Sequence, residues 1–491
     1  MTRPDLRRRG SRGDQRRNEP DGAADPSTVR GVAKSPDASL LDVPLVGPVF
    51  RSRDPQQIRP ARDWALFALL VLYPLWRLLG ANLFIVPFLA VPMALELYRR
   101  RNLRFPAGFN VYVLLIFIAL ISVTMINKTP PGAIPPQPGV GRYLAWALRV
   151  LDFISGAVVL LYVGNLTERE LPTRRVVKWL ATLFVTFVVG GILGMALAHV
   201  STLTPIGHVL PGSLRSNSFV KNLVTLQFAQ NQAVLGSVAP RPDFPLNYTN
   251  AWGECIALLL PWFLIAVMRA RRTMPRMFAA GATLAVAVVP TIYSLNRGMW
   301  IGLGIGAAYL LIRLVRTGRR AQVAAVLGAV ALVGVIMLTT GLGDVIGSRL
   351  EHPRSNDGRA NINHAAIVAA EASPIIGYGG MTGVIGSQRS IAIGPTADCP
   401  SCGNLTIGGD GQMWQLLITQ GFAGAILYVL FYLSFWWKYR RDPSPIAVAG
   451  TISILMMLMF MTVYTALELP LMIVMVGLGL WWRSARAQNL A

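Results

Sequence analysis

The chain has few cysteines, few histidines and few acidic residues. Its 491 residues include 3 Cys, 4 His and 23 Asp plus Glu, whereas Lys plus Arg number 46. It also lacks a G-x-x-x-x-G-K-[ST] phosphate loop, an H-E-x-x-H motif and any long soluble segment able to form a nucleotide-binding domain. These absences argue against an ATP-driven machine.

The three cysteines are too few for a structural zinc site. Cys255 lies in an apolar stretch, and Cys399 and Cys402 form a single C-x2-C pair with no second pair or nearby histidine, so they cannot complete a tetrahedral zinc site. We expect the segment that carries the pair to lie outside the cell, where thiols are readily oxidised. We therefore favour a small loop disulfide between Cys399 and Cys402 over free thiols, and predict neither a metal site nor a cofactor.

Apolar residues, by contrast, are abundant. They make up 53% of the chain, charged residues make up 14%, and the mean hydropathy is +0.48, which is typical of a polytopic membrane protein. A helix needs roughly 17–25 mostly apolar residues to cross a hydrocarbon core about 30 Å thick. Twelve segments fit, although eleven or thirteen are alternatives: 64–79, 81–98, 108–126, 146–164, 177–199, 250–268, 277–294, 298–314, 321–340, 413–437, 445–464 and 467–482. The predicted fold is an all-α bundle of about twelve membrane-spanning helices.

The net charge of +23 follows the membrane topology. Thirteen of the basic residues lie in the first 62 residues, and further clusters recur in alternate loops, at 99–101, 174–175, 269–276, 313–320 and 438–441. Loops that keep positive charge lie in the cytoplasm, so we expect both termini inside. The charge therefore does not indicate nucleic-acid binding. Membrane lipids are expected partners, because the basic N-terminal tail can touch anionic headgroups.

This topology divides the chain into seven parts. We expect a disordered basic cytoplasmic tail at 1–62 and a short cytoplasmic tail at 483–491. Between them we expect helices 1–5 at 63–199, an outer loop at 200–249, helices 6–9 at 250–340, a large outer loop at 341–412 and helices 10–12 at 413–482. The large outer loop, which we expect to be partly helical, is polar and rich in glycine, with arginines, a histidine and acidic groups. We expect any chemistry to take place there.

Arg297 lies in the turn Ser-Leu-Asn-Arg-Gly at 294–298, at the expected outer boundary of the membrane. An arginine at membrane depth costs roughly several kcal/mol unless it is paired or hydrated. Two interpretations stay open. Arg297 either extends to lipid phosphates or binds a substrate phosphate through the two parallel hydrogen bonds that a guanidinium can donate.

A second arginine, Arg359, lies in the first turn of a helix that we predict at 359–372. Ser355, Asn356 or Asp357 can cap this helix, and Pro374 ends it. Backbone amides and Arg359 would then converge on one anion site. His364 lies five residues further on, about 140° around the helix from Arg359. We include it as a candidate for substrate binding, although a structural hydrogen bond explains it as well as catalysis does.

Asp410 precedes the tenth predicted span, in the sequence Gly-Gly-Asp-Gly-Gln at 408–412. It is either a simple helix cap or a carboxylate that deprotonates an acceptor hydroxyl. The glycines here and at 377–380 permit tight turns and the close approach of a ligand to the backbone.

Three further polar residues are candidates for substrate binding. Arg215, with Lys221 and Arg241, gives the outer loop 200–249 a basic character that suits glycan phosphates or lipid headgroups. Asn250 and Glu254 lie one turn apart in the sixth span, where they either contact substrate or serve helix packing.

Several of these motifs, taken in order, resemble the O-antigen ligase and polymerase family of bacterial surface polysaccharide assembly. They are the Ser-x-x-Arg-Gly turn at 294–298, Arg349-Leu350 followed by Gly358-Arg359, Pro-x-x-Gly-x-Gly at 374–379, Asp410 followed by Gln-Gly-Phe-Ala-Gly at 420–424, and Phe-Pro-Leu-Asn-Tyr-Thr-Asn at 244–250. The resemblance covers residues 240–440. Many members have His-Asn at the last motif, where this chain has Asp410-Gly411.

The resemblance implies a metal-independent, inverting membrane glycosyltransferase with a GT-C-like fold in the bacterial inner membrane. Such an enzyme takes a glycan from a polyprenyl-diphosphate-linked donor and transfers it to a glycan, lipid or cell-wall acceptor on the outer face. Arg297 and Arg359 match the family's diphosphate-binding arginines, and Asp410 takes the place of its base. A transporter or flippase of lipid-linked glycans is the rival interpretation, because twelve spans with both ends inside is also a transporter arrangement, although no internal repeat supports it.

Overall fold

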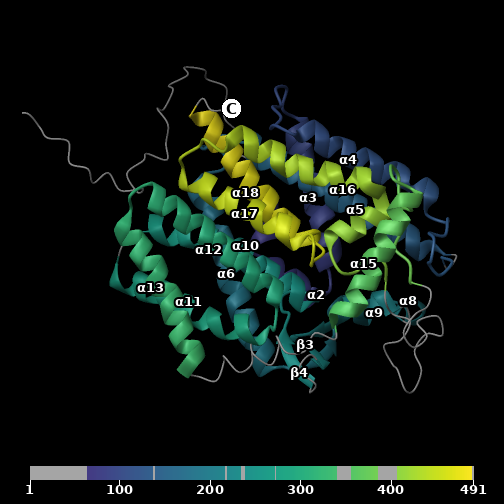
Figure 1. The fold of residues 1–491 in the computed structure, drawn as a ribbon, viewed down its shortest axis with the longest axis horizontal. Coiled ribbons are helices and arrows are strands. Elements are labelled where there is room, and N and C mark those ends of the chain that lie inside the picture. Colours follow the sequence, from purple (N-terminus) through teal and green to yellow (C-terminus); the bar gives the residue numbers. More distant parts are fainter. Residues whose placement is uncertain are drawn as a thin grey trace, which may run out of the picture. The chain divides into compact units, whose positions relative to one another are not determined.

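The computed structural model describes residues 63–136, 139–215, 218–233, 238–270, 273–339, 355–384 and 406–488, and helices dominate this part of the chain (Figure 1). The helices of the predicted spans are α1 (Trp64–Leu70), α2 (Tyr73–Leu79), α3 (Asn82–Tyr98), α4 (Phe109–Ile121), α5 (Val140–Asn165), α6 (Thr173–Ala196), α10 (Thr249–Arg269), α11 (Met274–Tyr293), α12 (Arg297–Arg316), α13 (Arg320–Thr339), α16 (Gln412–Tyr439), α17 (Pro445–Phe460) and α18 (Glu468–Ala487). A 3-10 helix, Ser122–Met125, continues α4. Every segment predicted to span the membrane overlaps one or two of these helices.

Within the described residues, six helices are long and apolar enough to cross a membrane: α5, α6, α10, α11, α12 and α16. The apolar helices α3, α4 with its 3-10 extension, and α17 are shorter. The protein is therefore mostly helical with six candidate membrane spans.

The prediction of one continuous helix at 64–79 is wrong. The structure has two helices of seven residues, α1 and α2, separated at Val71 and Leu72. Pro74 explains the break, because proline has no N–H to donate to the carbonyl of Leu70 four residues earlier, and it is tolerated in the first turn of α2. Each helix is about 10 Å long, too short to cross a membrane alone.

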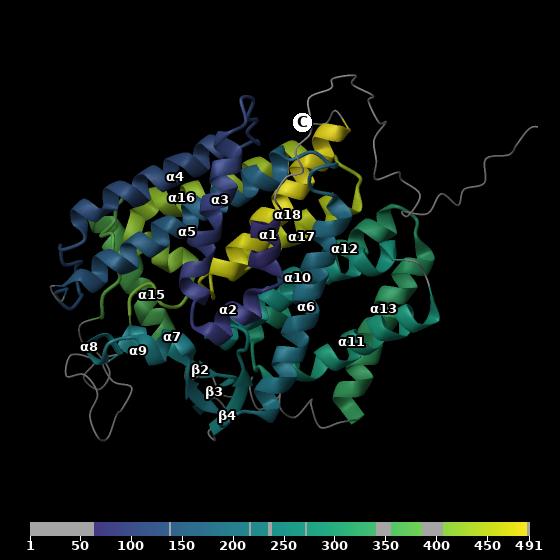
Figure 2. The same ribbon diagram turned by 180° about the vertical axis from the view of Figure 1, so that it is seen from behind.

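The segment expected as the outer loop 200–249 contains small sheets as well as short helices, which the all-α prediction did not include. β1 (Ser201–Leu203) pairs with β2 (Thr225–Gln227), and β3 (Ala229–Ala233) pairs with β4 (Val238–Pro242), both antiparallel. Three short helices lie between β1 and β2: α7 (Pro205–Val209), α8 (Gly212–Arg215) and α9 (Ser218–Val224). Figure 2 shows the strands near one another beside α6.

Close contacts between tryptophans and glycines join the central helices. Trp252, Trp262, Trp481 and Trp482 are fully buried. Each lies against a glycine of another helix, where an added Cβ would clash with the indole ring: Gly191, Gly477, Gly450 and Gly164, respectively. Small residues let membrane helices approach closely, so these pairs fix how α5, α6, α10, α17 and α18 fit together.

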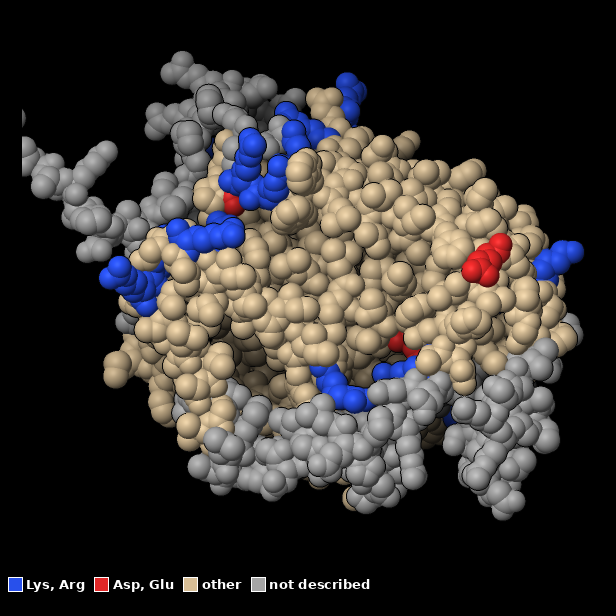
Figure 3. All heavy atoms as spheres, viewed as in Figure 1, with Lys and Arg blue, Asp and Glu red and all other residues tan. Residues whose placement is uncertain are grey.

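Basic side chains lie at the carboxyl ends of several helices. The last turns of α10, α12, α16 and α18 contain Arg269, Arg313 with Arg316, Lys438 and Arg486. At this end Arg313 Nη2 donates a hydrogen bond to Pro443 O, 3.1 Å away, and so joins the end of α12 to the chain just before α17. On the face shown in Figure 3, basic side chains gather at the upper left and the wide middle part is uncharged.

Candidate active site

The candidate site is built on a junction between α15 (Ser355–Ala372) and a kink in α16. Gly421, inside α16, has φ 66° and ψ −169°, a conformation that is essentially restricted to glycine. A Cβ at Gly421 would lie 2.5 Å from the carbonyl oxygens of Ser373 and Pro374, and Ala423 N donates to Pro374 O over 3.0 Å. The turn after α15 is thus inserted into the kink of α16.

The glycine-rich turn at 377–380 continues this junction. Tyr378 N and Gly379 N donate to the carbonyls of Ile418 and Thr419, over 2.8 and 3.0 Å. Gly379 O in turn accepts a 2.7 Å hydrogen bond from the buried side chain of Arg149 in α5. The glycines thus allow close approach of backbone to backbone, whereas the sequence had suggested close approach to a ligand.

Arg359 and Asp410 meet beside this junction. A helix is confirmed in the segment predicted at 359–372, but α15 begins at Ser355, so the predicted cap residues lie inside it and Arg359 lies in its second turn, not its first. Arg359 Nε lies 3.9 Å from Asp410 Oδ1, with the two side chains 40% and 21% exposed. The contact is at the outer limit of an ion pair. Arg359 and Asp410, which the sequence indicated separately and which are 51 positions apart, therefore lie next to each other.

The surroundings of Asp410 favour a role as a base. Burial raises the pKa of this carboxyl above its usual value, and the positive charge of Arg359 acts in the opposite direction. Among the described residues, no donor forms a hydrogen bond with the buried Oδ2 atom. A carboxylate oxygen without a donor keeps its lone pairs available for a proton.

The start of α16 is held by the turn that follows α17. Gln412 N donates to Tyr464 O and Met413 N donates to Met461 O, both over 2.7 Å. A Cβ at Gly411 would lie 2.8 Å from Met461 O, so the backbone next to Asp410 touches this turn directly.

Tyr464 links Asp410 to the turn that contains Arg297. A Cβ at Gly298 would lie 2.3 Å from the Tyr464 hydroxyl oxygen, so the phenol ring covers the first turn of α12. Tyr464 is buried, and it joins the start of α12 to the start of α16, whose Gln412 N donates to its carbonyl oxygen.

Arg297 is the first residue of α12 and is half-buried. Asn296 caps the helix, since its side chain accepts a hydrogen bond from Met299 N over 3.3 Å and donates to Thr249 O over 3.4 Å. The first turns of α12 and α16 thus gather around Tyr464 and Asp410. Helix N-termini carry partial positive charge, so this arrangement attracts anions.

Arg241 is a part of this site that the sequence did not single out, beyond its contribution to a basic loop. It lies in β4 and is buried, and its Nε donates to Ser294 O over 2.7 Å. Its Nη2 donates to Asn250 Oδ1 over 3.4 Å. Arg241 therefore joins the 200–249 segment to the Arg297 turn and to α10. We refer to Arg241, Arg297, Arg359, Asp410 and Tyr464 as the mixed-charge cluster.

The other predicted site residues lie in different surroundings. Asn250 contacts Arg241, whereas Glu254 is fully buried in α10 and its carboxylate oxygens have no hydrogen-bond partner among the described residues. His364 is exposed on α15, and Arg215 is half-buried at the end of α8. Their substrate-binding roles stay predictions. Cys399 and Cys402, like the Ser348-Arg349-Leu350 motif and the tail 1–62, lie outside the described residues.

No group of three or more His, Cys, Asp or Glu side chains that could hold a metal ion occurs in the described ranges.

Compared with known proteins, the chain matches no protein-family model, and no curated protein matches it. The relation to the O-antigen ligases and polymerases therefore stays a prediction that rests on the ordered motifs of residues 240–440.

Proposed function

We propose that the protein is a membrane glycosyltransferase of the O-antigen ligase or polymerase type. It would transfer a glycan from a polyprenyl-diphosphate-linked donor to a glycan, lipid or cell-wall acceptor. The observation that carries the proposal is the contact of Arg359 with Asp410, 3.9 Å apart, beside the helix that begins with Arg297. An enzyme of this type needs a cation for the leaving diphosphate and a base for the acceptor, and this contact places one of each side by side.

In the proposed reaction, the bond between the anomeric carbon and the diphosphate oxygen breaks, and the acceptor oxygen forms a bond to that carbon from the opposite side. Arg297 and Arg359 stabilise the negative charge that develops on the departing polyprenyl diphosphate. The N-termini of α12 and α16 add positive electrostatic potential. Asp410 orients the acceptor hydroxyl group and takes its proton as the new bond forms.

The location of this chemistry follows from the distribution of charge along the helices. In a bacterial inner membrane, the basic carboxyl ends of α10, α12 and α16 would face the cytoplasm. The mixed-charge cluster would then lie at the outer surface, with both termini inside. Activated donors are available there as lipid-linked glycans, which supports a lipid-diphosphate donor over a soluble sugar nucleotide.

Glu254 favours a second candidate, a transporter of lipid-linked glycans. It is fully buried in a candidate membrane span, and both carboxylate oxygens lack a hydrogen-bond partner among the described residues. Ionisable groups inside membranes are often found on transport pathways. An assay for the proposed enzyme should therefore measure transbilayer movement as well as transfer.

The test is reconstitution of purified protein in vesicles with a polyprenyl-diphosphate-linked oligosaccharide and an envelope acceptor fraction. We expect release of polyprenyl diphosphate together with a modified acceptor, unaffected by EDTA. Arg297→Ala should lower the rate by roughly 10²- to 10³-fold, the usual cost of one anion-stabilising donor. Arg316→Ala, on the same helix but exposed at its other end, should leave it unchanged.

The products also discriminate among the alternatives. A ladder of products would indicate a polymerase, and a single added block would indicate a ligase. If no acceptor supports release and the lipid-linked glycan instead crosses the bilayer, the enzyme proposal is refuted in favour of transport.

A further inference from the structure

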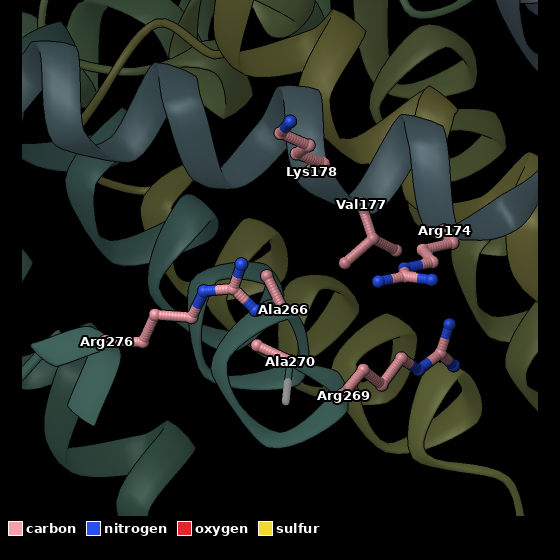
Figure 4. A pocket seen from close by; sticks show the side chains of 7 residues that line it. All are labelled: Arg174, Val177, Lys178, Ala266, Arg269, Ala270 and Arg276. Atoms are coloured by element: carbon pink, nitrogen blue, oxygen red, sulfur yellow. The ribbon is translucent and has the colours of Figure 1, made fainter. Parts of the chain in front are cut away.

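A cavity of about 340 Å³ lies at the basic end of the helices, between α6, α10 and the start of α11. Its lining comprises Arg174, Val177, Lys178, Ala266, Arg269, Ala270 and Arg276. Figure 4 shows Arg174 and Arg276 directing their guanidinium groups toward the centre from opposite sides, while the guanidinium of Arg269 lies below that of Arg174. We call this cavity the basic cavity, because four basic residues line it: Arg174, Lys178, Arg269 and Arg276. The volume is within the usual range of small-ligand sites, about 300–1,000 Å³.

Among the described residues, no acid lines this cavity to balance its positive charge. The neighbouring acid, Glu168, is already engaged: its carboxylate oxygens accept hydrogen bonds from Thr173 N and Oγ1, over 2.7 and 2.6 Å, and one of them lies 3.3 Å from Arg483 Nη2. Arg269 Nε and Nη2 are buried, with no hydrogen-bond partner among the described residues. Buried donors without an acceptor are unfavourable, so an anion with several oxygens would stabilise this arrangement.

A second cavity adjoins the first and has a different lining. Its volume is about 530 Å³, it shares Lys178 with the basic cavity, and its lining includes the aromatic side chains Trp64, Phe67 and Trp179. Phe67 and Trp179 contact each other edge to face, with ring centroids 5.6 Å apart, whereas Trp64 and Phe67 remain 48% and 37% exposed. Arg175 also lines this cavity and is paired with Asp63 over 2.5 Å.

From these observations we infer that the two cavities bind one anionic phospholipid of the adjoining leaflet. The phosphate group of the lipid occupies the basic cavity, where Arg174, Arg269 and Arg276 donate to its oxygens. An acyl chain lies against the aromatic side chains of the second cavity, beside Lys178. Basic pockets between membrane helices are suited to lipid headgroups, and the apolar neighbour distinguishes a lipid from a free phosphate.

The test measures retention of lipid by the full-length protein, without any transfer assay. Detergent-purified protein is titrated with dioleoylphosphatidylglycerol, with dioleoylphosphatidylcholine as the zwitterionic control and glycerol phosphate as the chain-free control, and binding is read by native mass spectrometry. The phosphatidylglycerol complex should form in preference to the other two. The double variant Arg174→Gln/Arg269→Gln should bind it about 30-fold more weakly, since each basic side chain near an anionic headgroup contributes roughly a factor of five.

Two matched variants make the result decisive. Arg316→Gln removes one exposed charge from the same end of the helices but outside the cavity, and should retain lipid as the wild type does. Trp179→Ala should weaken phosphatidylglycerol binding but not glycerol phosphate binding. Unchanged binding in the double variant, or equal losses in Arg316→Gln, would refute the site. Equal affinity for glycerol phosphate and the lipid would refute a lipid as its occupant. The unfolding temperature of each variant, measured with phosphatidylcholine present, checks that the variant is folded.

Discussion

The mixed-charge cluster and the basic cavity lie at opposite ends of α10, a helix of 21 residues and therefore about 30 Å long. Both contain arginines beside helix ends, and we propose a phosphate group as the ligand of both. The mixed-charge cluster also contains Asp410 and the first turns of α12 and α16, whereas the basic cavity has no acid among the described residues that line it and adjoins a helix carboxyl end. An anion bound at the cluster has a proton acceptor beside it, and an anion bound in the cavity does not. The first arrangement suits chemistry, and the second suits binding alone.

The largest expected effect comes from removing the carboxylate of Asp410, which distinguishes the mixed-charge cluster from the basic cavity. Asp410→Asn keeps the shape of the side chain but removes the base, and should lower the turnover of glycan transfer by roughly 10²- to 10⁴-fold. Donor binding, which depends on the arginines, should change little. Turnover and KM for the lipid-linked donor are measured together, with Glu371→Gln as the control, because Glu371 is an exposed carboxylate on α15. Equal losses in both variants would contradict a specific role for Asp410.

A second test concerns the arginine that faces this base. Burial raises the pKa of Asp410 and Arg359 lowers it, and a base acts only when deprotonated, so activity is present above this pKa and is lost as the pH falls through it. The acidic limb of the pH profile should therefore lie above that of an ordinary aspartate. Arg359→Gln should move this limb to still higher pH, in addition to lowering the maximal rate by roughly 10²- to 10³-fold.

The matched measurement is the pH profile of Arg297→Gln. Arg297 is assigned to the leaving group alone, so this variant should lose rate without a comparable shift of the acidic limb. If the limb stays in place in Arg359→Gln, the contact between Arg359 and Asp410 has no influence on catalysis.

The sequence predicted local features better than the contacts between distant segments. Apolar segment lengths located the helices, and turn residues located α15, because both signals are local. Arg359 and Asp410 were recognised separately from their motifs. Arg241 was not singled out, because its position depends on the β3–β4 pairing and on its contact with Ser294. Tyr464 was missed because it lies in a short turn without a polar motif and acts through its contact with Gly298.

The motifs around 374–380 and 420–424 show the same limit in another way. Their glycines predicted positions where another group approaches the backbone closely, but the sequence did not indicate whether that group is a ligand or another segment of the chain. The structure shows that the two motifs approach each other. They hold α15 against α16 and thereby set the positions of Arg359 and Asp410. Part of the resemblance to the ligase and polymerase family therefore lies in residues that build the site.

The smallest expected effect concerns the junction between α15 and the kink of α16. This junction supports the mixed-charge cluster but is remote from the basic cavity. Gly421→Ala forces a side chain into a glycine-only conformation and against the carbonyls of Ser373 and Pro374, at a cost of roughly 1–3 kcal/mol. The free energy of unfolding, followed by helix signal in detergent, should fall by that order, and transfer should fall with it as α15 shifts. Gly304→Ala is the matched control, because no atom lies within 4 Å of an added Cβ there and alanine favours the helix. Lipid binding in the basic cavity should survive Gly421→Ala, because the junction and the cavity share no residue; a parallel loss of both functions would show that the two regions are not independent.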